Sequence, residues 1–342
     1  MTEIPLSYTP SPGEPEPARV YVHVAAVHNH HAEELHHMSR LPDGSYHASF
    51  SVPDDVCTSY LIAPVDEDFL TRFDPPGPVD TRARWLALLE RALPGPPALR
   101  GETGRIRGPR ALPEPEWDDL SPTPEEWEPV SIDSPSPRRV WRARTGPAPE
   151  FLLLLFDATF WLRTPLPRAL RAAGLPPLEI LAVDTGDGEE RFEVMGRTPE
   201  LPRFLHEDLL PRTPWTPART IVCGQSLGGL AALSIGAGRP RIADLVLSQS
   251  GSFWFPAWGG EDGGELAAEL RDPQVIARLR ERGVRAHFSV GLAEADMVPH
   301  TRAVVDALEA AGVPTSLEVS RHGHEMAGWM GALSRGLRQL LR

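Results

Sequence analysis

The sequence predicts an α/β protein with a mostly parallel sheet, preceded by a small antiparallel β-sandwich. After residue 128, near-continuous apolar segments alternate with helical patterns, as expected for parallel strands covered on both faces. Before residue 93, short segments alternate apolar and polar residues, which is typical of half-exposed strands. A long run rich in Pro and acidic residues separates the two patterns, so we predict two domains.

These changes in pattern divide the chain of 342 residues into four parts. We predict a flexible Pro-rich arm (1–17), an N-terminal β-sandwich-like domain (18–93), a Pro-rich linker (94–127) and a catalytic α/β domain (128–342).

Each predicted element has its own local signal. Strands of the first domain are expected at 18–27, 45–52 and 58–65, and a helix at 80–93 begins after Asp80, a favourable N-cap. In the second domain a hairpin at 128–134 and 138–145 precedes strands at 151–157, 178–184, 219–224, 243–249, 284–291 and 315–320. Helices are expected at 165–174, 200–211, 226–238, 265–282, 299–312 and 325–341.

Composition excludes some classes of function. The formal net charge is −13 and the chain contains no Lys, so binding to nucleic acid is not expected. The two cysteines fall in different predicted domains, which argues against a disulfide framework. The chain starts without a signal-peptide pattern, and no segment is long and apolar enough to insert into a membrane. We therefore expect a cytoplasmic protein.

The stretch Gly-Gln-Ser-Leu-Gly-Gly at 224–229 carries the main chemical signal. An apolar strand runs directly into a small-residue helix there, and a turn that sharp holds its apex residue, Ser226, in a strained conformation. Gly224 and Gly228 allow the strand and helix backbones to approach each other closely. Ser226 is therefore predicted to be a nucleophile, with the backbone N–H of Leu227 as an oxyanion donor.

A nucleophilic Ser needs a base and an acid, which follow it in the chain in this type of fold. His322 and His324 both fall in the loop before the last helix, and we prefer His324 because it directly follows Gly323. The loop after the strand at 284–291 offers two acids, Glu294 and Asp296, and the residues alone do not choose between them.

The second oxyanion donor is expected from the loop after an earlier strand. The strand at 151–157 ends at Asp157, so the N–H of Ala158 or Thr159 is the predicted donor.

These residues resemble one family across nearly the whole chain. The segment RTIVCGQSLGGLAALSIGAGRPRIADLVLSQSGSFWFP is similar to the nucleophile region of the enterochelin (enterobactin) esterases, which are α/β-hydrolases. Further similar segments are LLFDATFW, RTPELP, GLAEADM, HGHEMAGW and VYVHVAAVHNHH. The chain departs from the family pattern at Ala158, where the family has Gly, and at Ala293, where it has Arg.

The resemblance implies hydrolysis of the trilactone of ferric enterobactin or a related catecholate siderophore, followed by iron release. It implies Ser226 as nucleophile and His324 as base, and it favours Glu294 as the acid. Substrate contacts implied by the resemblance are Arg197, Trp161 and Trp254. Arg191 is a further candidate, because a guanidinium suits an anionic catecholate.

Alternative functions are a general or feruloyl-type carboxylesterase, and a siderophore-binding protein with an inactive triad. We expect no cofactor, since iron enters only with the substrate. The His-rich segment 28–37 lacks the ligand spacing of a metal site, so we predict no metal site there.

Overall fold

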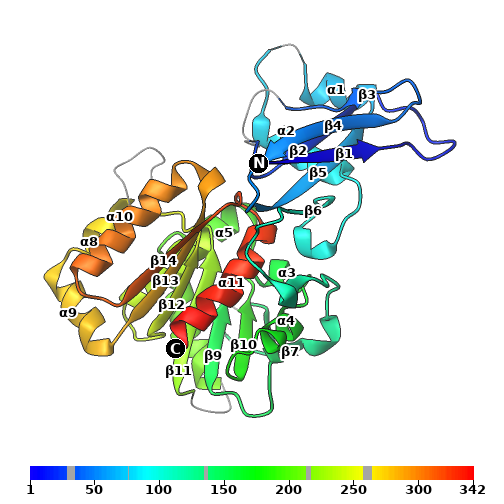
Figure 1. The fold of residues 1–342 in the computed structure, drawn as a ribbon. Helices are drawn as coiled ribbons and strands as arrows, with labels where there is room; N and C mark the ends of the chain where they lie inside the picture. The colour runs from blue at the N-terminus through cyan, green and yellow to red at the C-terminus, as the bar shows by residue number, and fades with distance from the viewer. Residues whose placement is uncertain (29–34, 76, 135–137, 213–216, 257–263) are drawn as a thin grey trace. The chain divides into compact units, whose positions relative to one another are not determined.

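The computed structural model describes residues 1–28, 35–75, 77–134, 138–212, 217–256 and 264–342 (Figure 1). The chain forms two compact units. Unit 1 contains Met1–Pro113 and Arg321–Gly328, and unit 2 contains Glu114–Ser320 and Trp329–Arg342.

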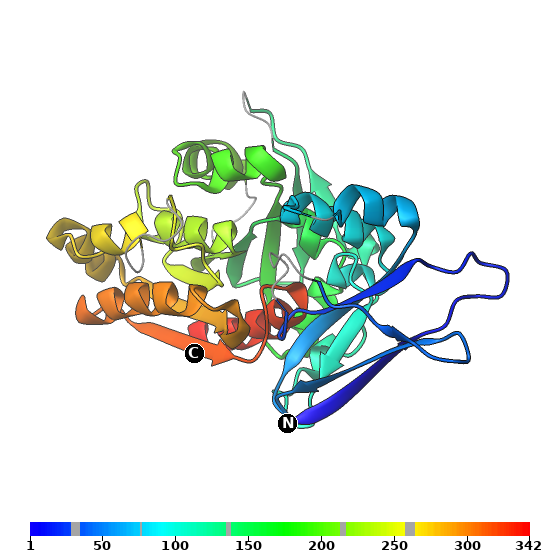
Figure 2. The same ribbon diagram turned by 90° about the horizontal axis from the view of Figure 1, so that it is seen from above.

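Unit 1 is built on two three-stranded antiparallel sheets (Figure 2). One has the order β1 (Thr2–Tyr8), β4 (Tyr46–Val52), β3 (Ser39–Arg40) and the other β2 (Arg19–Val24), β5 (Cys57–Val65), β6 (Gly104–Arg107). Side chains from both sheets form one buried cluster that includes Leu6, Val22, Val52, Ile62 and Ile106. The predicted β-sandwich is therefore confirmed.

Two helices pack on the sheet that contains β2 and β5. They are α1 (Glu67–Phe73) and α2 (Thr81–Arg91), and their Phe69 and Leu88 join Leu61 in a second buried cluster. The Asp80 side chain accepts the Ala83 N–H at 2.9 Å, which confirms the predicted cap of the helix expected at 80–93.

The predicted arm and linker both contain regular structure. Strand β1 lies inside the segment 1–17 and pairs with β4 over its whole length. The segment 94–127 contains β6 and three short 3₁₀ helices, η1 (Pro97–Leu99), η2 (Pro115–Trp117) and η3 (Pro124–Glu126). Each 3₁₀ helix begins at a Pro, whose fixed φ suits the first position of a helix. A high Pro content alone was therefore a poor indicator of an unstructured linker.

Unit 2 has an eight-stranded sheet with the order β14-β13-β12-β11-β9-β10-β8-β7. The first six strands in that order are parallel, and β8 and β7 form the predicted antiparallel hairpin. The strands are β7 (Glu128–Val130), β8 (Val140–Arg144), β9 (Phe151–Leu155), β10 (Leu178–Val183), β11 (Arg219–Gln225), β12 (Leu245–Gln249), β13 (Arg285–Gly291) and β14 (Thr315–Ser320).

Helices connect these strands. They are α3 (Ala158–Trp161), α4 (Leu166–Ala172), α5 (Gly188–Met195), α6 (Glu200–Arg203), α7 (Leu227–Ala237), α8 (Gly264–Glu269), α9 (Pro273–Arg282), α10 (Met297–Ala310) and α11 (Met326–Leu340). The helix expected at 265–282 is two helices, because Asp272 caps a new one before Pro273. The helix expected at 200–211 is a short α-helix followed by a π-helical stretch, η4 (Phe204–Leu209), and a 3₁₀ turn, η5 (Leu210–Arg212). Helices α3 and α5 were not predicted.

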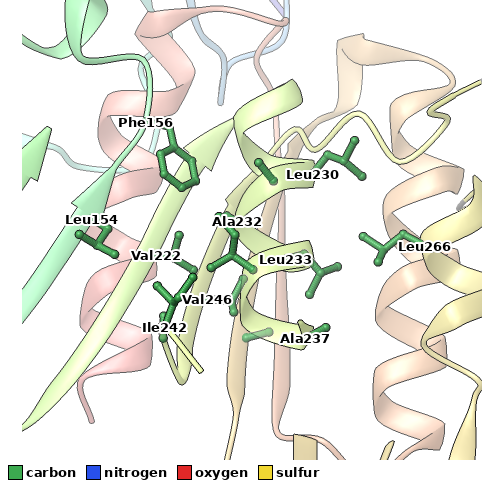
Figure 3. Close-up of a cluster of buried hydrophobic side chains, with 14 of the residues drawn as sticks. Leu154, Phe156, Val222, Leu230, Ala232, Leu233, Ala237, Ile242, Val246 and Leu266 are labelled. Carbon is green, nitrogen blue, oxygen red and sulfur yellow. The ribbon is translucent and has the colours of Figure 1, made fainter. Parts of the chain in front are cut away.

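Strand β12 shows that helices cover both faces of the sheet. The Ser248 hydroxyl donates to the carbonyl of Gly229 in α7 at 3.0 Å. The next residue, Gln249, donates from its amide to the carbonyl of Trp329 in α11 at 2.7 Å. Because successive side chains of a strand point to opposite faces, α7 and α11 lie on opposite sides. Figure 3 shows the apolar cluster between α7 and the sheet, with residues from β9, β11, β12 and α8.

Arg335 of α11 links the sheet to the segment before the first strand of unit 2. Its guanidinium bonds Glu114 at 2.6 Å and Glu318 of β14 at 2.7 and 2.9 Å. Burial alone would raise the pKa of Glu318, but the hydrogen bonds and charge of Arg335 outweigh burial and lower it. The ion pair therefore stabilises the fold above the ordinary carboxyl pKa and loses this contribution as the pH falls through the lowered pKa.

We expect Arg335→Met to lower the free energy of unfolding by about 3–5 kcal/mol at pH 7, because two largely buried carboxylates lose their counter-charge. The difference from wild type should shrink below about pH 4, where carboxyl groups protonate. Urea unfolding at both pH values measures this. Arg142→Met is the control, because the pair of Arg142 with Glu128 is more exposed (33% and 67%) and should change stability much less. Equal losses in the two variants would contradict the prediction.

Candidate active site

Ser226 stands at a sharp bend between β11 and α7. Its φ is 58° and its ψ −123°, a conformation that side-chain-bearing residues rarely adopt. Its N–H donates to the carbonyl of Gln249 at 2.9 Å, and its carbonyl accepts the N–H of Ser252 at 3.0 Å. These bonds to the end of β12 and the loop after it hold the bend in place, and Ser226 stays partly exposed.

The backbones of β11 and α7 approach each other closely at the two glycines of the motif, and Gly224 is needed there for steric reasons. A Cβ added to Gly224 would overlap the backbone carbonyl of Gly228. A Cβ on Gly228 would lie 3.4 Å from the Asp157 carboxylate and 3.6 Å from the Phe156 side chain. The first turn of α7 therefore packs directly against the end of β9, as the motif predicted.

Asp157 is the centre of a buried polar network next to this turn. Its carboxylate accepts two bonds from Arg191, from Nε at 2.7 Å and from an Nη at 2.8 Å, and a third from the Thr185 hydroxyl at 2.9 Å. The Gln225 side-chain amide donates to it at 3.2 Å. The residue before the nucleophile is thereby tied to the loop after β9.

Two residues predicted to contact substrate belong to this network. Arg191 is engaged by Asp157 in a bidentate ion pair. Trp161 is fully buried, and its indole N–H donates to Gln225 Oε1 at 3.3 Å. Both side chains lie in elements, α5 and α3, that the sequence pattern did not reveal.

The two predicted oxyanion donors begin neighbouring helices. Leu227 is the first residue of α7 and Ala158 the first of α3, and first-turn N–H groups have no acceptor within their own helix. Asp157, just before Ala158, has φ 56°, so this loop also adopts a left-handed conformation. A Cβ added to Gly228 would lie 3.4 Å from the Asp157 carboxylate, so the two helix starts are close to each other.

Glu294 lies in the loop after β13 and is buried. Its Oε1 accepts the N–H of Gly291 and the hydroxyl of Ser250, both at 2.6 Å. Ser250 in turn accepts the indole N–H of Trp329 at 2.9 Å. These bonds fix the orientation of the Glu294 carboxylate. Asp296 is exposed at the start of α10, so Glu294 is the better oriented of the two predicted acids.

The histidines of this region have different surroundings. His324 is exposed and belongs to the segment Arg321–Gly328 of unit 1. His322 is buried with its ring against Gly328, and its Nδ1 lies 2.7 Å from the Gly323 carbonyl. His287 is buried in β13 with Nδ1 2.8 Å from the Ser316 hydroxyl, and burial lowers its pKa. His300 is also buried in α10.

Comparison with known proteins identifies the family. No protein-family model matches the chain. The iron(III) enterobactin esterase of Dickeya dadantii (strain 3937) is 30% identical over 363 residues, which cover 94% of this chain and 83% of that protein. This chain belongs to the iron(III) enterobactin esterase family.

Solved structures agree with this assignment. The ferric enterobactin esterase from Salmonella typhimurium has a TM-score of 0.83 at 27% identity, covering 99% of this chain and 93% of that one. The enterobactin esterase from Shigella flexneri, solved in the presence of enterobactin, has a TM-score of 0.80 at 25% identity, covering 99% and 92%. The protein is a serine hydrolase that acts on carboxylic esters, as the sequence predicted.

Two residues of this esterase predicted to contact substrate lie in different settings. Arg197 pairs with Glu265 at 3.4 Å and with Glu269, and it lines a pocket of about 420 Å³ beside the C-terminal half of α7. Ser226 is at the opposite end of that helix and does not line this pocket. Trp254 is half-buried in the loop after β12, with its ring centroid 6.3 Å from that of Phe255.

Two serines near the nucleophile were not predicted. The Ser252 hydroxyl lies 3.4 Å from that of Ser226, and Ser250 holds Glu294. Both come from the loop after β12, next to β11 in the sheet. Because carboxyl ends of neighbouring parallel strands meet at one edge, the polar run SQSGS after an apolar strand was the signal that would have found them.

The described residues contain no cluster of three or more potential metal ligands. Most of the His-rich segment, residues 29–34, lies outside the described residues. In the described part of the chain, no helix is both long enough and apolar enough to cross a membrane.

We expect Glu294→Gln to lower kcat by up to about 10⁴-fold, because an amide cannot stabilise the imidazolium that forms on a general-base histidine. Asp296→Asn, two residues away and exposed, is the matched control and should stay within about twofold of wild type. Steady-state hydrolysis of p-nitrophenyl butyrate measures both. The reverse result would assign the acid to Asp296.

Proposed function

We propose that this esterase hydrolyses the trilactone of ferric enterobactin, or of a related catecholate siderophore, at its seryl ester bonds and so releases iron in the cytoplasm. The observation that carries the proposal is the match to enterobactin esterases over 94% of the chain, together with a strained Ser at a strand–helix turn. The Shigella flexneri relative was solved in the presence of enterobactin and of 2,3-dihydroxy-N-benzoyl-serine. Neither cysteine of this chain is in a disulfide, which suits the reducing cytoplasm.

The proposed reaction is a two-step acyl transfer. His324 takes the Ser226 proton while Ser226 Oγ attacks the carbonyl carbon of a seryl ester. The tetrahedral intermediate collapses, the bond to the seryl oxygen breaks, and His324 returns its proton to that leaving oxygen. Water then attacks the acyl-enzyme, again with His324 as base, and the products are a free carboxylate and regenerated Ser226.

The N–H groups of Leu227 and Ala158 are the proposed oxyanion donors. Ala158 replaces the glycine of the family pattern, but a backbone donor does not depend on its side chain. Removal of one such donor typically lowers kcat by about 10²–10³-fold. Glu294 is the proposed acid that orients His324 and stabilises its charged form.

A ferric tris-catecholate combines negative charge with flat aromatic faces. Trp254, in the loop after β12, is the proposed aromatic contact. Arg191 bonds the Asp157 carboxylate, and its proposed role is to support the site through Asp157. Arg197, which lines the pocket beside α7, is a further proposed contact for the substrate.

We expect Ser226→Ala to abolish hydrolysis of both ferric and iron-free enterobactin while ferric siderophore still quenches Trp fluorescence. The reason is that the variant loses the nucleophile and keeps the surrounding contacts. Chromatography of the linear products measures hydrolysis. Ser49→Ala, at an exposed serine of β4 in unit 1, is the control and should retain activity.

Other outcomes would identify the alternatives. Quenching without hydrolysis by the unmutated protein would favour a binding protein. Turnover of simple acyl esters without turnover of catecholate lactones would favour a general carboxylesterase.

A further inference from the structure

The segment that carries His324 is attached to strand β5 of unit 1. The Cys57 N–H donates to the Arg321 carbonyl at 3.0 Å. Gly323 packs so closely on the backbone of Ala25 that a Cβ would overlap the Ala25 carbonyl oxygen. The residues just before the proposed base therefore contact the backbone of Cys57 and of Ala25.

Glu325, directly after His324, is the centre of this attachment. It is buried, and its carboxylate accepts four hydrogen bonds. Oε1 accepts the Thr58 hydroxyl at 2.5 Å and the Gly323 N–H at 3.0 Å. Oε2 accepts the Ser59 N–H at 2.5 Å and also the Ser59 hydroxyl. Each oxygen thus receives one backbone and one side-chain donor.

Glu102 is a second buried carboxyl group in this region. Burial, and next the charge of Glu325, raise the pKa of Glu102, against a smaller opposing effect of Arg100. Its Oε2 has no hydrogen-bond partner within the described parts of the chain. Burial also raises the pKa of Glu325, against the hydrogen bonds from Ser59, Thr58 and Gly323 that favour its charged form.

We propose that Glu325 is a positioning residue that fixes the loop of the general base His324 to strand β5, so that the N-terminal unit takes part in catalysis. The inference rests on the proposed role of His324. The Gly323 N–H precedes His324 in the chain and the Glu325 side chain follows it, so one set of bonds constrains the backbone on both sides of the base. A misplacement of a catalytic group by about 1 Å can cost about 10²-fold in rate.

Glu325→Gln tests this with almost no change in shape. A glutamine has one acceptor oxygen and one NH₂ group. Since each Glu325 oxygen accepts a backbone N–H, either orientation of the amide would direct its NH₂ group at a backbone donor. One bond that holds the loop is lost whichever way the side chain turns.

We expect kcat to fall roughly 10- to 100-fold in Glu325→Gln, with KM changed less than about threefold. The second-order rate constant for phosphonylation of Ser226 by a fluorophosphonate should fall in parallel. The titre of reactive sites should stay near wild type, which separates positioning from partial unfolding. Unchanged rate constants at a reduced titre would overturn the proposal, since they indicate a purely structural residue.

Two further variants complete the test. Ser59→Ala removes one donor to Glu325 from the N-terminal unit and should cause a smaller loss of the same rate constants, even if Glu325→Gln does not fold. Asp55→Asn removes an exposed ion pair with Arg321 of the same segment, 2.8 Å long, and should leave them unchanged. Wild-type rates in Ser59→Ala and folded Glu325→Gln would refute the inference.

Phosphonylation does not depend on the natural substrate. If the wild-type protein reacts with the fluorophosphonate but does not cleave enterobactin, the proposed substrate fails. The comparison of Glu325→Gln with wild type still decides the inference in that case.

Discussion

The backbone bend at Ser226 is the constraint on which the candidate site depends. A positive φ at a residue with a side chain costs about 1–3 kcal/mol and persists only where the surroundings enforce it. Here the Ser226 carbonyl accepts the N–H groups of Gly229, Leu230 and Ser252, while its own N–H reaches the end of β12. Bonds to the end of β12, to the loop after it and to the first turn of α7 thus hold the φ of Ser226 at its positive value. As a result, the Ser226 hydroxyl lies at the carboxyl edge of the sheet.

A second residue with a positive φ, Asp157, lies in the loop just after the adjacent strand β9. The buried Arg191–Asp157 pair lies between the two bends, and Gln225 connects them. Burial of an ion pair is costly unless its remaining groups are satisfied. In this network Thr185 and Gln225 donate further hydrogen bonds to the Asp157 carboxylate, which offset the cost of burying the ion pair. The same bonds connect the turn at Asp157 to the turn at Ser226.

The sequence predicted what depends on short-range pattern. The alternation of strands and helices, the capped helix after Asp80 and the mostly parallel character of the sheet all follow from periodicity and turn chemistry. The contacts of Arg191 and Trp161 could not be predicted in this way, because their partners are 34 and 64 residues away in the chain.

The segment 94–127 shows the same limit of prediction from sequence. Its Pro content suggested a linker, but Trp117 is buried and donates to Ser334, 217 residues later. The composition of a segment indicates its local flexibility, but it does not reveal hydrogen-bond partners that are so far away in the chain.

The acid and the base of the proposed triad are anchored by separate frameworks. Glu294 is oriented within unit 2 by Ser250, which Trp329 holds, whereas the segment of His324 is fixed within unit 1 by Glu325. Both anchors use the same physical device, a buried carboxylate whose oxygens accept backbone and hydroxyl donors. Because a buried carboxylate strongly resists losing these donors, each anchor resists displacement of its own loop. The antiparallel sandwich at the start of the chain thus holds the loop that carries the proposed base.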